Sequence, residues 1–473
     1  MENLEFVLPE IFISLSIMFL LILGVFKKDS SKLIQNISLL VLTVTAVITF
    51  NETLSIEEIT LFNDSIIIDY LSSLMKIVTL ISAFLVLVIS ANYLRSLKIF
   101  KIEYPILILS SVLGMMIMIS SNDLIVFYMG LELQSLALYV LATFNRDQIK
   151  SSEAGLKYFV LSALSSGLLL YGCSLIYGFS GSTNFNVIAN ELNSNEYALT
   201  FGIVFILVGL AFKISAVPFH MWAPDVYEGS PTSVTLFFTM VPKIAALTVF
   251  IRFLYVPFLN LIDQWQTILI FLSIASMVFG AIAAIGQKNL KRLVAYSSIG
   301  HVGYALAGLA TGSNEGIQSS IIYIIIYVLM NLGLFSCLLM MKRNNVYYEQ
   351  IDDLSGLSKN HPLLSLSLLI ILFSLAGIPP LAGFFAKFYI FKSVLEQSMF
   401  FLAIVGLLST VIAAFYYLRL IKLMYFDKEK EKFDTDHSLW LKFSLGVSTL
   451  LILIYFIFPS QLIELVSRIN MIQ

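Results

Sequence analysis

The chain has 473 residues, of which 59% are hydrophobic and only 12% are charged, and its formal net charge is −2 at pH 7. Because soluble domains carry about 25% charged residues, this composition excludes a soluble globular protein and predicts an integral membrane protein. The net charge indicates no class of partner; we expect contact with the lipid bilayer and none with nucleic acid.

Apolar stretches long enough to cross a bilayer, about 20 residues each, recur along the whole chain. In chain order they cover residues 5–26, 33–50, 68–94, 104–120, 124–144, 155–179, 199–218, 231–256, 265–286, 291–311, 317–341, 362–394, 399–425 and 440–462. We therefore predict an all-α polytopic membrane protein with about 14 transmembrane helices in a single transmembrane domain, residues 1–473.

Glu132 lies well inside the fifth stretch. A charge at the bilayer centre costs roughly 2.5–3.5 kcal/mol, and such residues usually face a bundle interior or a water-filled cavity. No charged residue lies four positions before or after Glu132, so we expect its partner on another helix. The carboxylate is either a proton carrier or half of a structural ion pair.

The seventh stretch is interrupted by proline, in the order Lys213, Pro218, His220. Proline breaks a helix, and at membrane depth the freed backbone groups need protein or a water cavity. Lys213 is a plausible partner for Glu132, because a buried lysine can release its proton near neutral pH. His220 is a further candidate for a proton pathway, as is Lys157 in the sixth stretch. A simple kink, and a lysine that reaches out to the interface, are the alternatives.

Lys243 lies in the middle of the eighth stretch, directly after Pro242. His301, near the start of the tenth, titrates near neutrality and either joins Ser297, Ser298 and Tyr304 in a proton wire or is a packed polar residue.

A second break occurs in the twelfth stretch, where Pro379 and Pro380 precede Lys387. This stretch is long enough for two half-helices, and it follows the first break by five helices. A repeat unit of five helices places its two copies in opposite orientation, so we predict inverted five-helix repeats with two broken helices. The parts are three N-terminal helices, a first repeat, a second repeat and a last helix, at about 1–103, 104–256, 265–425 and 440–473.

Basic residues gather in alternate loops, such as Arg95, Lys98 and Lys101 after the third stretch, whereas the other loops carry few. The positive-inside rule then places the basic loops in the cytoplasm and both termini outside, in the periplasm. We expect a multi-pass protein of a bacterial inner membrane; a mitochondrial inner membrane is less favoured.

Motifs for redox cofactors, nucleotides and metals are absent from the sequence, which has no CxxC, Walker, strand-linked GxGxxG or HExxH motif. The two cysteines, Cys173 and Cys337, lie in apolar stretches and are expected to be packing residues. We therefore expect no metal and no cofactor on this chain.

Two runs, 130-GLELQSLALYVL-141 and 219-FHMWAPDVYEGSP-231, together with 374-SLAGIPPLAGFFAKF-388, resemble the antiporter-like subunits of respiratory complex I. The resemblance extends over about residues 5–460. It implies a fourteen-helix fold with inverted repeats, and a subunit of a translocase that couples electron transfer from NADH to quinone to proton pumping.

The resemblance also implies a role for each buried charge. Glu132 tunes Lys213 electrostatically, Lys243 connects the two halves, and Lys387 leads to the exit side. NADH, FMN, iron–sulfur clusters and quinone would then be bound by other subunits, and other membrane-arm subunits would be the partners. A subunit of a multisubunit sodium/proton antiporter and a purely structural membrane module are the competing interpretations.

Overall fold

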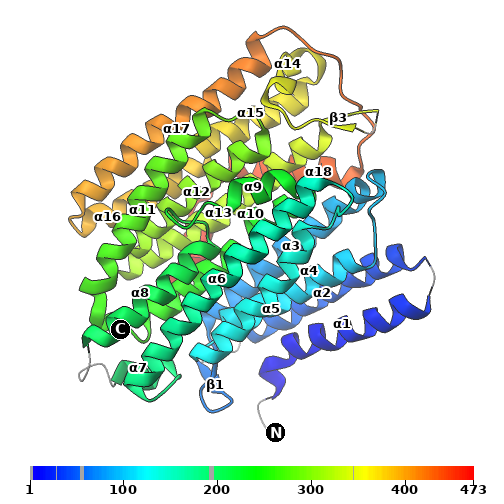
Figure 1. The fold of residues 1–473 in the computed structure, drawn as a ribbon. Coiled ribbons are helices and arrows are strands. Elements are labelled where there is room, and N and C mark those ends of the chain that lie inside the picture. The colour runs from blue at the N-terminus through cyan, green and yellow to red at the C-terminus, as the bar shows by residue number, and fades with distance from the viewer. Residues whose placement is uncertain (1–3, 28, 54–57, 191–195, 345, 473) are drawn as a thin grey trace. The chain divides into compact units, whose positions relative to one another are not determined.

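The computed structural model describes residues 4–27, 29–53, 58–190, 196–344 and 346–472, and most of them are helical (Figure 1). The chain forms two compact units. The first comprises Met1–Ile214, Val241–Trp265 and Gln473, and the second comprises Ser215–Met240 and Gln266–Ile472.

The first unit contains the N-terminal helices and the C-terminal part of α10. Its elements are η1 (Leu4–Val7), α1 (Leu8–Phe26), α2 (Ser31–Thr53), β1 (Ile59–Leu61), β2 (Ile66–Ile68), α3 (Tyr70–Ser96), α4 (Glu103–Ile119), α5 (Leu124–Ala142), α6 (Ile149–Ser180), α7 (Phe185–Asn190), α8 (Glu196–Lys213), the end of α10 (Thr232–Tyr255) and η3 (Leu259–Leu261).

The second unit contains the remaining helices and a second hairpin. Its elements are α9 (Ala223–Gly229), the start of α10, most of α11 (Ile262–Ile285), α12 (Leu290–Leu309), α13 (Asn314–Met340), β3 (Lys342–Arg343), β4 (Val346–Tyr347), η4 (Ile351–Leu354), α14 (Leu357–Asn360), α15 (Pro362–Ala376), α16 (Ala382–Glu396), α17 (Phe400–Phe426), α18 (Leu439–Ile454) and α19 (Ser460–Ser467).

Helices lie over the predicted apolar stretches, and the long twelfth stretch holds two, α15 and α16. Within the described part of the chain, nine helices are long and apolar enough to cross a membrane, and four apolar helices are shorter. The chain is thus a predominantly helical polytopic membrane protein.

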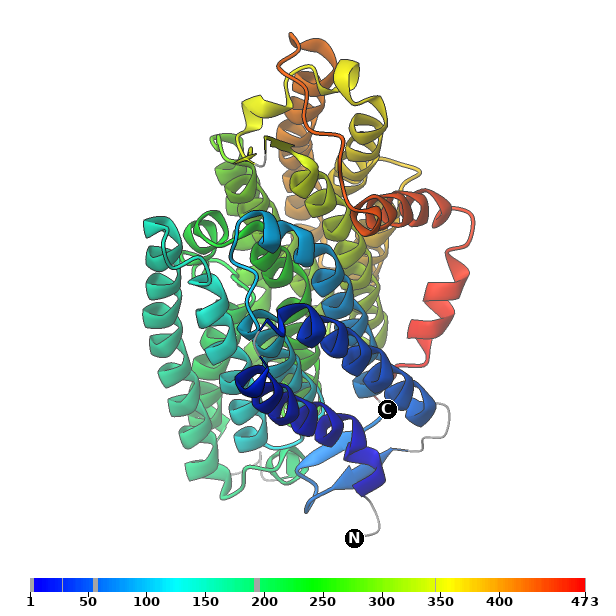
Figure 2. The ribbon, with the colours of Figure 1, turned by 90° about the vertical axis from the view of Figure 1, so that its right-hand side faces the viewer.

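Two short hairpins depart from the all-helical prediction. β1 pairs antiparallel with β2, and β3 with β4. The turn of the first hairpin contains Asn63 and Asp64 at φ of 54° and 62°, a left-handed conformation that these two residue types tolerate well. Figure 2 shows this hairpin beside η1, which packs on it through Val7, Leu61 and Ile68. Strands of two or three residues lie below what a hydrophobic pattern can reveal.

Several helices begin at side-chain caps. Asp69 accepts the backbone N–H of Ser72 at 2.8 Å, and the Ser72 hydroxyl accepts the N–H of Asp69, which is a capping box at the start of α3. Asp123 caps α5 by accepting the N–H groups of Ile125 and Val126. These caps fix where α3 and α5 begin, and therefore which residues of each helix lie at membrane depth.

Small residues let α4 and α5 approach closely. A Cβ atom on Gly114 would lie 2.5 Å from the backbone nitrogen of Gln134, and one on Gly130 would lie 2.8 Å from that of Met118. Backbones this close require glycine at both crossing points. The crossing holds the segment of α5 that carries Glu132 firmly against α4.

Both predicted helix breaks are present. The first separates α8, which ends at Lys213, from α9, which begins at Ala223; the second separates α15 from α16. Each contains a residue in the left-handed region, Ser215 at φ 61° and Gly377 at φ 87°, and each contains a cis peptide before a proline. Pro218, Pro379 and Pro380 lie at these breaks with exposed side chains.

Candidate functional site

Lys213, the last residue of α8, lies buried in the first unit with its side chain between α5 and α6. Its Nζ donates to the hydroxyl oxygens of Ser135 and Ser162, each at 2.7 Å. The ammonium also lies 5.9 Å from the ring centroid of Tyr139, whose hydroxyl donates to Ser162 at 2.6 Å. Its direct partners are therefore neutral groups that can both donate and accept hydrogen bonds.

Glu132 supplies the negative charge near this lysine. It lies on α5 one turn before Ser135, is half-buried, and interacts electrostatically with the Lys213 ammonium. Its Oε1 is buried without a hydrogen-bond partner among the described residues. The structure thus brings Glu132 and Lys213 into one cluster, which the sequence predicts, without a direct salt bridge between them.

More polar atoms lie buried on the same two helices. The Oε1 of Gln134 on α5 and the hydroxyls of Ser165 and Ser166 on α6 have no hydrogen-bond partner within the described chain. Buried polar atoms in native proteins are usually bonded to protein or to ordered water, so these atoms are positions where ordered water is expected.

Lys243 lies within α10, directly after Pro242, and only 3% of its surface is exposed. This excludes the alternative that it reaches out to an interface. Lys76 on α3 forms an ion pair with Glu10 of α1, at 2.5 Å and with both side chains nearly fully buried.

Lys387 bridges the second break. It is the sixth residue of α16, and its Nζ donates to the carbonyl oxygens of Leu375 and Ala376, at 3.1 and 3.0 Å, which are the last two residues of α15. Gly377 must be glycine here because its φ is 87° and an added Cβ would lie 3.0 Å from the Lys387 side chain. The ammonium also lies 4.9 Å from the ring centroid of Tyr304.

His301 forms the centre of a chain of hydrogen bonds in the second unit. Its Nδ1 pairs with the Tyr323 hydroxyl at 2.6 Å and its Nε2 with the Tyr417 hydroxyl at 3.1 Å. Tyr417 in turn pairs with Ser297 at 2.5 Å. Because each of these groups can donate and accept, the chain has the composition of a proton wire.

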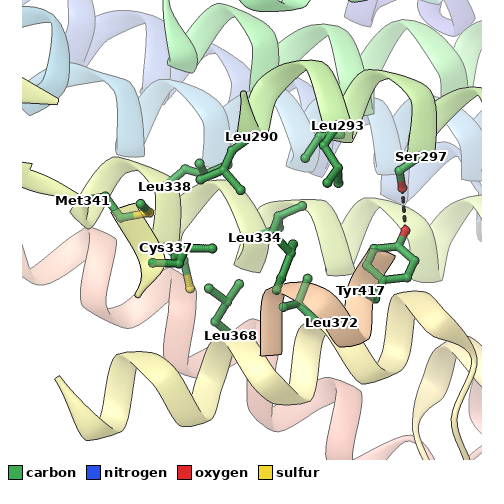
Figure 3. Close-up of a pocket in the computed structure, with 13 residues that line it drawn as sticks. Leu290, Leu293, Ser297, Leu334, Cys337, Leu338, Met341, Leu368, Leu372 and Tyr417 are labelled. Carbon is green, nitrogen blue, oxygen red and sulfur yellow. Dashed lines mark hydrogen bonds between the residues drawn. The ribbon is translucent and has the colours of Figure 1, made fainter. Parts of the chain in front are cut away.

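A small cavity adjoins this chain, with a volume of about 20 Å³. Figure 3 shows Ser297 and Tyr417 at one end of it and Met341 at the other, with leucines of α12, α13 and α15 between them. A cavity of this size holds about one water molecule, but apolar cavities stay dry unless several polar groups face them. Only its Ser297–Tyr417 end offers such groups.

The remaining predicted residues are Lys157, His220 and the two cysteines. Lys157 is half-exposed on α6 and pairs with Glu153 at 2.7 Å, one turn away on the same helix. His220 lies in the first break, where its ring packs 4.5 Å from that of Phe279 and its Nδ1 is buried without a hydrogen-bond partner among the described residues. The free thiols of Cys173 and Cys337 are buried, as packing residues should be.

Sequence reasoning missed the hydroxyl partners of the charged groups. Ser135, Ser162, Tyr323 and Tyr417 all lie in apolar helices where serine and tyrosine are common. The available signal was spacing: Ser135 follows Glu132 by three residues, which puts both on the same helix face.

Comparison with known proteins gives consistent matches. The family described as NADH:quinone oxidoreductase/Mrp antiporter, transmembrane, matches residues 121–413. The chain is 77% identical over 472 residues to NADH-quinone oxidoreductase subunit N of Pelagibacter ubique, covering 100% of both chains. It is 49% identical over 460 residues to subunit N of Parvibaculum lavamentivorans, covering 96% of this chain and 95% of that one.

Solved structures agree with these matches. A chain of respiratory complex I from Thermus thermophilus with bound aureothin is 29% identical, with a TM-score of 0.84, over 97% of this chain and 99% of that one. A chain of the Mrp complex from Dietzia is 21% identical, with a TM-score of 0.86, over 98% and 96%. The second likeness shows a shared fold only.

Proposed function

The chain belongs to the NADH:quinone oxidoreductase/Mrp antiporter family of transmembrane subunits, and we propose that it acts as the proton-translocating subunit N in the membrane arm of a bacterial NADH–quinone oxidoreductase. The full-length identity of 77% to a subunit N carries this assignment. The chain is one subunit of a translocase, so the oxidoreductase activity belongs to the assembled complex.

The pumping residues that we propose are Glu132, Lys213, Lys243 and Lys387. A proton enters from the cytoplasmic side to Lys213, crosses by way of Lys243 to Lys387, and leaves on the outer side. His301 serves as a relay between hydroxyl groups. The buried lysines and the unpartnered polar atoms around Lys213 support this path, because charged groups at membrane depth usually mark ion or proton pathways.

Control of the path rests on the Glu132–Lys213 interaction. Two unit charges 4 Å apart interact by about 4 kcal/mol at an effective dielectric constant of 20, which is an upper bound for Glu132 and Lys213 because they form no direct salt bridge. A change of that size alters proton affinity by up to about three orders of magnitude, at 1.36 kcal/mol per tenfold change. Electron transfer elsewhere in the complex would act by changing this interaction.

The topology that we propose has about 14 crossings, inverted five-helix repeats and both termini in the periplasm, in line with the alternating basic loops. NADH, FMN, iron–sulfur clusters and quinone are bound by other subunits, and neighbouring membrane-arm subunits are the protein partners. A multisubunit sodium/proton antiporter is disfavoured, since the likeness to the Mrp complex is one of fold alone whereas the relatives of high identity are subunits N.

The test replaces Lys213 with Ala and Glu132 with Gln in the full complex. We expect both variants to comigrate with the NADH-oxidising band on native gels and to lose at least about threefold in NADH-driven proton pumping and quinone reduction. Lys392→Ala is the matched control, because that lysine is exposed on α16. Wild-type pumping by well-assembled Lys213→Ala complexes would refute the proposal.

A further inference from the structure

Helix α9 needs external support to keep its place. It follows the first break, has only seven residues and leads directly to α10, so it lies in the chain between Lys213 and Lys243. Helices shorter than about 12 residues are marginal by themselves. The position of α9 therefore depends on what it contacts.

Its two acidic residues meet a single arginine. Asp225 and Glu228 lie three positions apart, on one face of α9. Both accept hydrogen bonds from the same Nη1 atom of Arg292, at 2.7 and 3.1 Å. All three side chains are between 23% and 33% exposed, so water screens this cluster only partly.

Lys291, the residue before Arg292, holds the C-terminal end of α9. Lys291 is buried and donates to the backbone carbonyl of Ser230, the C-terminal cap of α9, at 3.0 Å. It also pairs with Glu349 at 2.9 Å, and Glu349 accepts the hydroxyl of Thr232 at the start of α10, at 2.7 Å. Two consecutive cations thus hold α9, Arg292 through its acidic side chains and Lys291 through its C-terminal cap.

These cations belong to the helix that carries the hydrogen-bonded chain of the second unit. Lys291 and Arg292 lie in the first turn of α12, and His301 follows about ten residues later, roughly 15 Å along the helix axis. The contacts of α9 and the hydrogen bonds of His301 therefore share one continuous helix.

We propose that Lys291 and Arg292, with their partners Asp225, Glu228, Ser230 and Glu349, form an α9 clasp that positions the first helix break for proton transfer. The clasp rests on the proposed pumping function. Its two cations are positioning residues: they touch no transferred proton, but they set the distance over which a proton moves from the break into the following helix. Misplacement by about 1 Å can slow such a step by up to about a hundredfold.

The test measures turnover and its solvent isotope effect in purified complex. Arg292→Gln should lower NADH–quinone turnover by about threefold to tenfold and raise the ratio of rates in H₂O and D₂O, because proton transfer then limits the rate. Arg292→Lys should keep at least about half of the activity, since one nitrogen atom serves both carboxylates. Lys288→Gln is the matched control: it removes a charge from an exposed side chain four residues earlier.

A double mutant separates the clasp from general damage. Combining Arg292→Gln with Asp225→Asn should be no worse than Arg292→Gln alone, since both changes break one interaction. If Arg292→Gln does not assemble, Asp225→Asn, which keeps the side-chain shape, carries the test. Wild-type turnover, or slow turnover with an unchanged isotope effect, would overturn the clasp. That result together with loss of pumping in Lys213→Ala would leave the proposed function standing.

Discussion

Lys213 and Lys387 both lie at breaks in apolar helices, yet different kinds of atom hold them. Lys213 donates to two serine hydroxyls, and the negative charge that acts on its ammonium is that of Glu132. Lys387 donates to two backbone carbonyls at the C-terminal end of α15, where the helix dipole is negative. The first ammonium is therefore stabilised by groups that can turn or change charge, and the second by groups that cannot.

This difference suggests a division of labour between the two breaks. A site held by hydroxyls and a separate carboxylate can be reset when the carboxylate moves or is protonated. A site held by fixed backbone dipoles keeps a constant proton affinity. Under the proposed function, pumping should therefore be regulated at Lys213, while the proton affinity of Lys387 stays constant.

The largest effects are expected when each of the two lysines is replaced with methionine, which tests whether the groups that hold them differ. Both variants should lose about tenfold or more in proton pumping. Lys387→Met should lose more stability than Lys213→Met, because it leaves two buried carbonyls without a donor, at about 1–3 kcal/mol each, whereas Glu132 can take up a proton when Lys213 is removed. In Lys213→Met the hydroxyls keep partners, since Ser135 donates to the carbonyl of Leu131 and Ser162 accepts from Tyr139.

Stability would be measured as the temperature at which the subunit leaves the complex on native gels. Lys392→Met, at an exposed position of α16, controls for the effect of methionine itself. Equal losses of stability in the two buried variants would contradict the distinction between Lys387, held by fixed backbone carbonyls, and Lys213, held by groups that can turn or change charge.

The two sites also differ in how far the sequence could predict them. Charges in apolar helices and prolines beside them are rare events, so Glu132, Lys213, Lys387 and both breaks could be predicted from the sequence. The carbonyls that hold Lys387 could not, because every residue has one and only the fold directs two of them at the ammonium. The two hairpins could not be predicted for another reason: strands of two or three residues are too short to show an alternating pattern of apolar and polar residues.

The ion pair of Lys157 follows from helical spacing, which brings it to Glu153 one turn away on α6. Its proposed place in a proton pathway stays a prediction. The shared contact of Asp225 and Glu228 with Arg292 could not be predicted from the sequence, because it joins residues more than sixty positions apart.

Tyr304 tests how the ammonium of Lys387 is held, with a smaller expected effect. Its ring faces the Lys387 ammonium, and its hydroxyl bonds with Ser409 and Thr410 at 3.0 and 2.9 Å. A buried cation–π contact contributes about 2 kcal/mol. Tyr304→Leu should therefore slow pumping by about threefold to tenfold, whereas Tyr304→Phe, which keeps the ring, should slow it by less than about twofold. A larger effect of Tyr304→Phe would show that pumping depends on the hydroxyl of Tyr304 rather than on the contact of its ring with the Lys387 ammonium.

The other end of α15 gives the smallest expected effect. His361 directly precedes Pro362, and its Nε2 accepts the backbone N–H of Phe433 at 3.0 Å, which joins the start of α15 to the segment after α17. Burial, followed by the positive charges of Lys432 and Arg343, lowers the pKa of His361 below its usual value of 6.5. His437 also faces this cluster, with its own pKa lowered by burial and by Lys342 and Lys442.

A lowered histidine pKa means that the unfolded segment binds a proton more readily than the folded one, so stability is complete above pH 6.5 and declines as the pH falls toward the folded pKa. Protonated His361 can no longer accept the N–H of Phe433. Hydrogen exchange at Phe433, corrected for its intrinsic pH dependence, should therefore rise below pH 6.5 by at most about tenfold per unit of pH. His361→Gln, whose side-chain carbonyl accepts the same bond at any pH, should flatten this rise. A rise that persists in His361→Gln would assign the pH dependence to His437, and a flat profile in the wild type would show that the segment after α17 is held independently of His361.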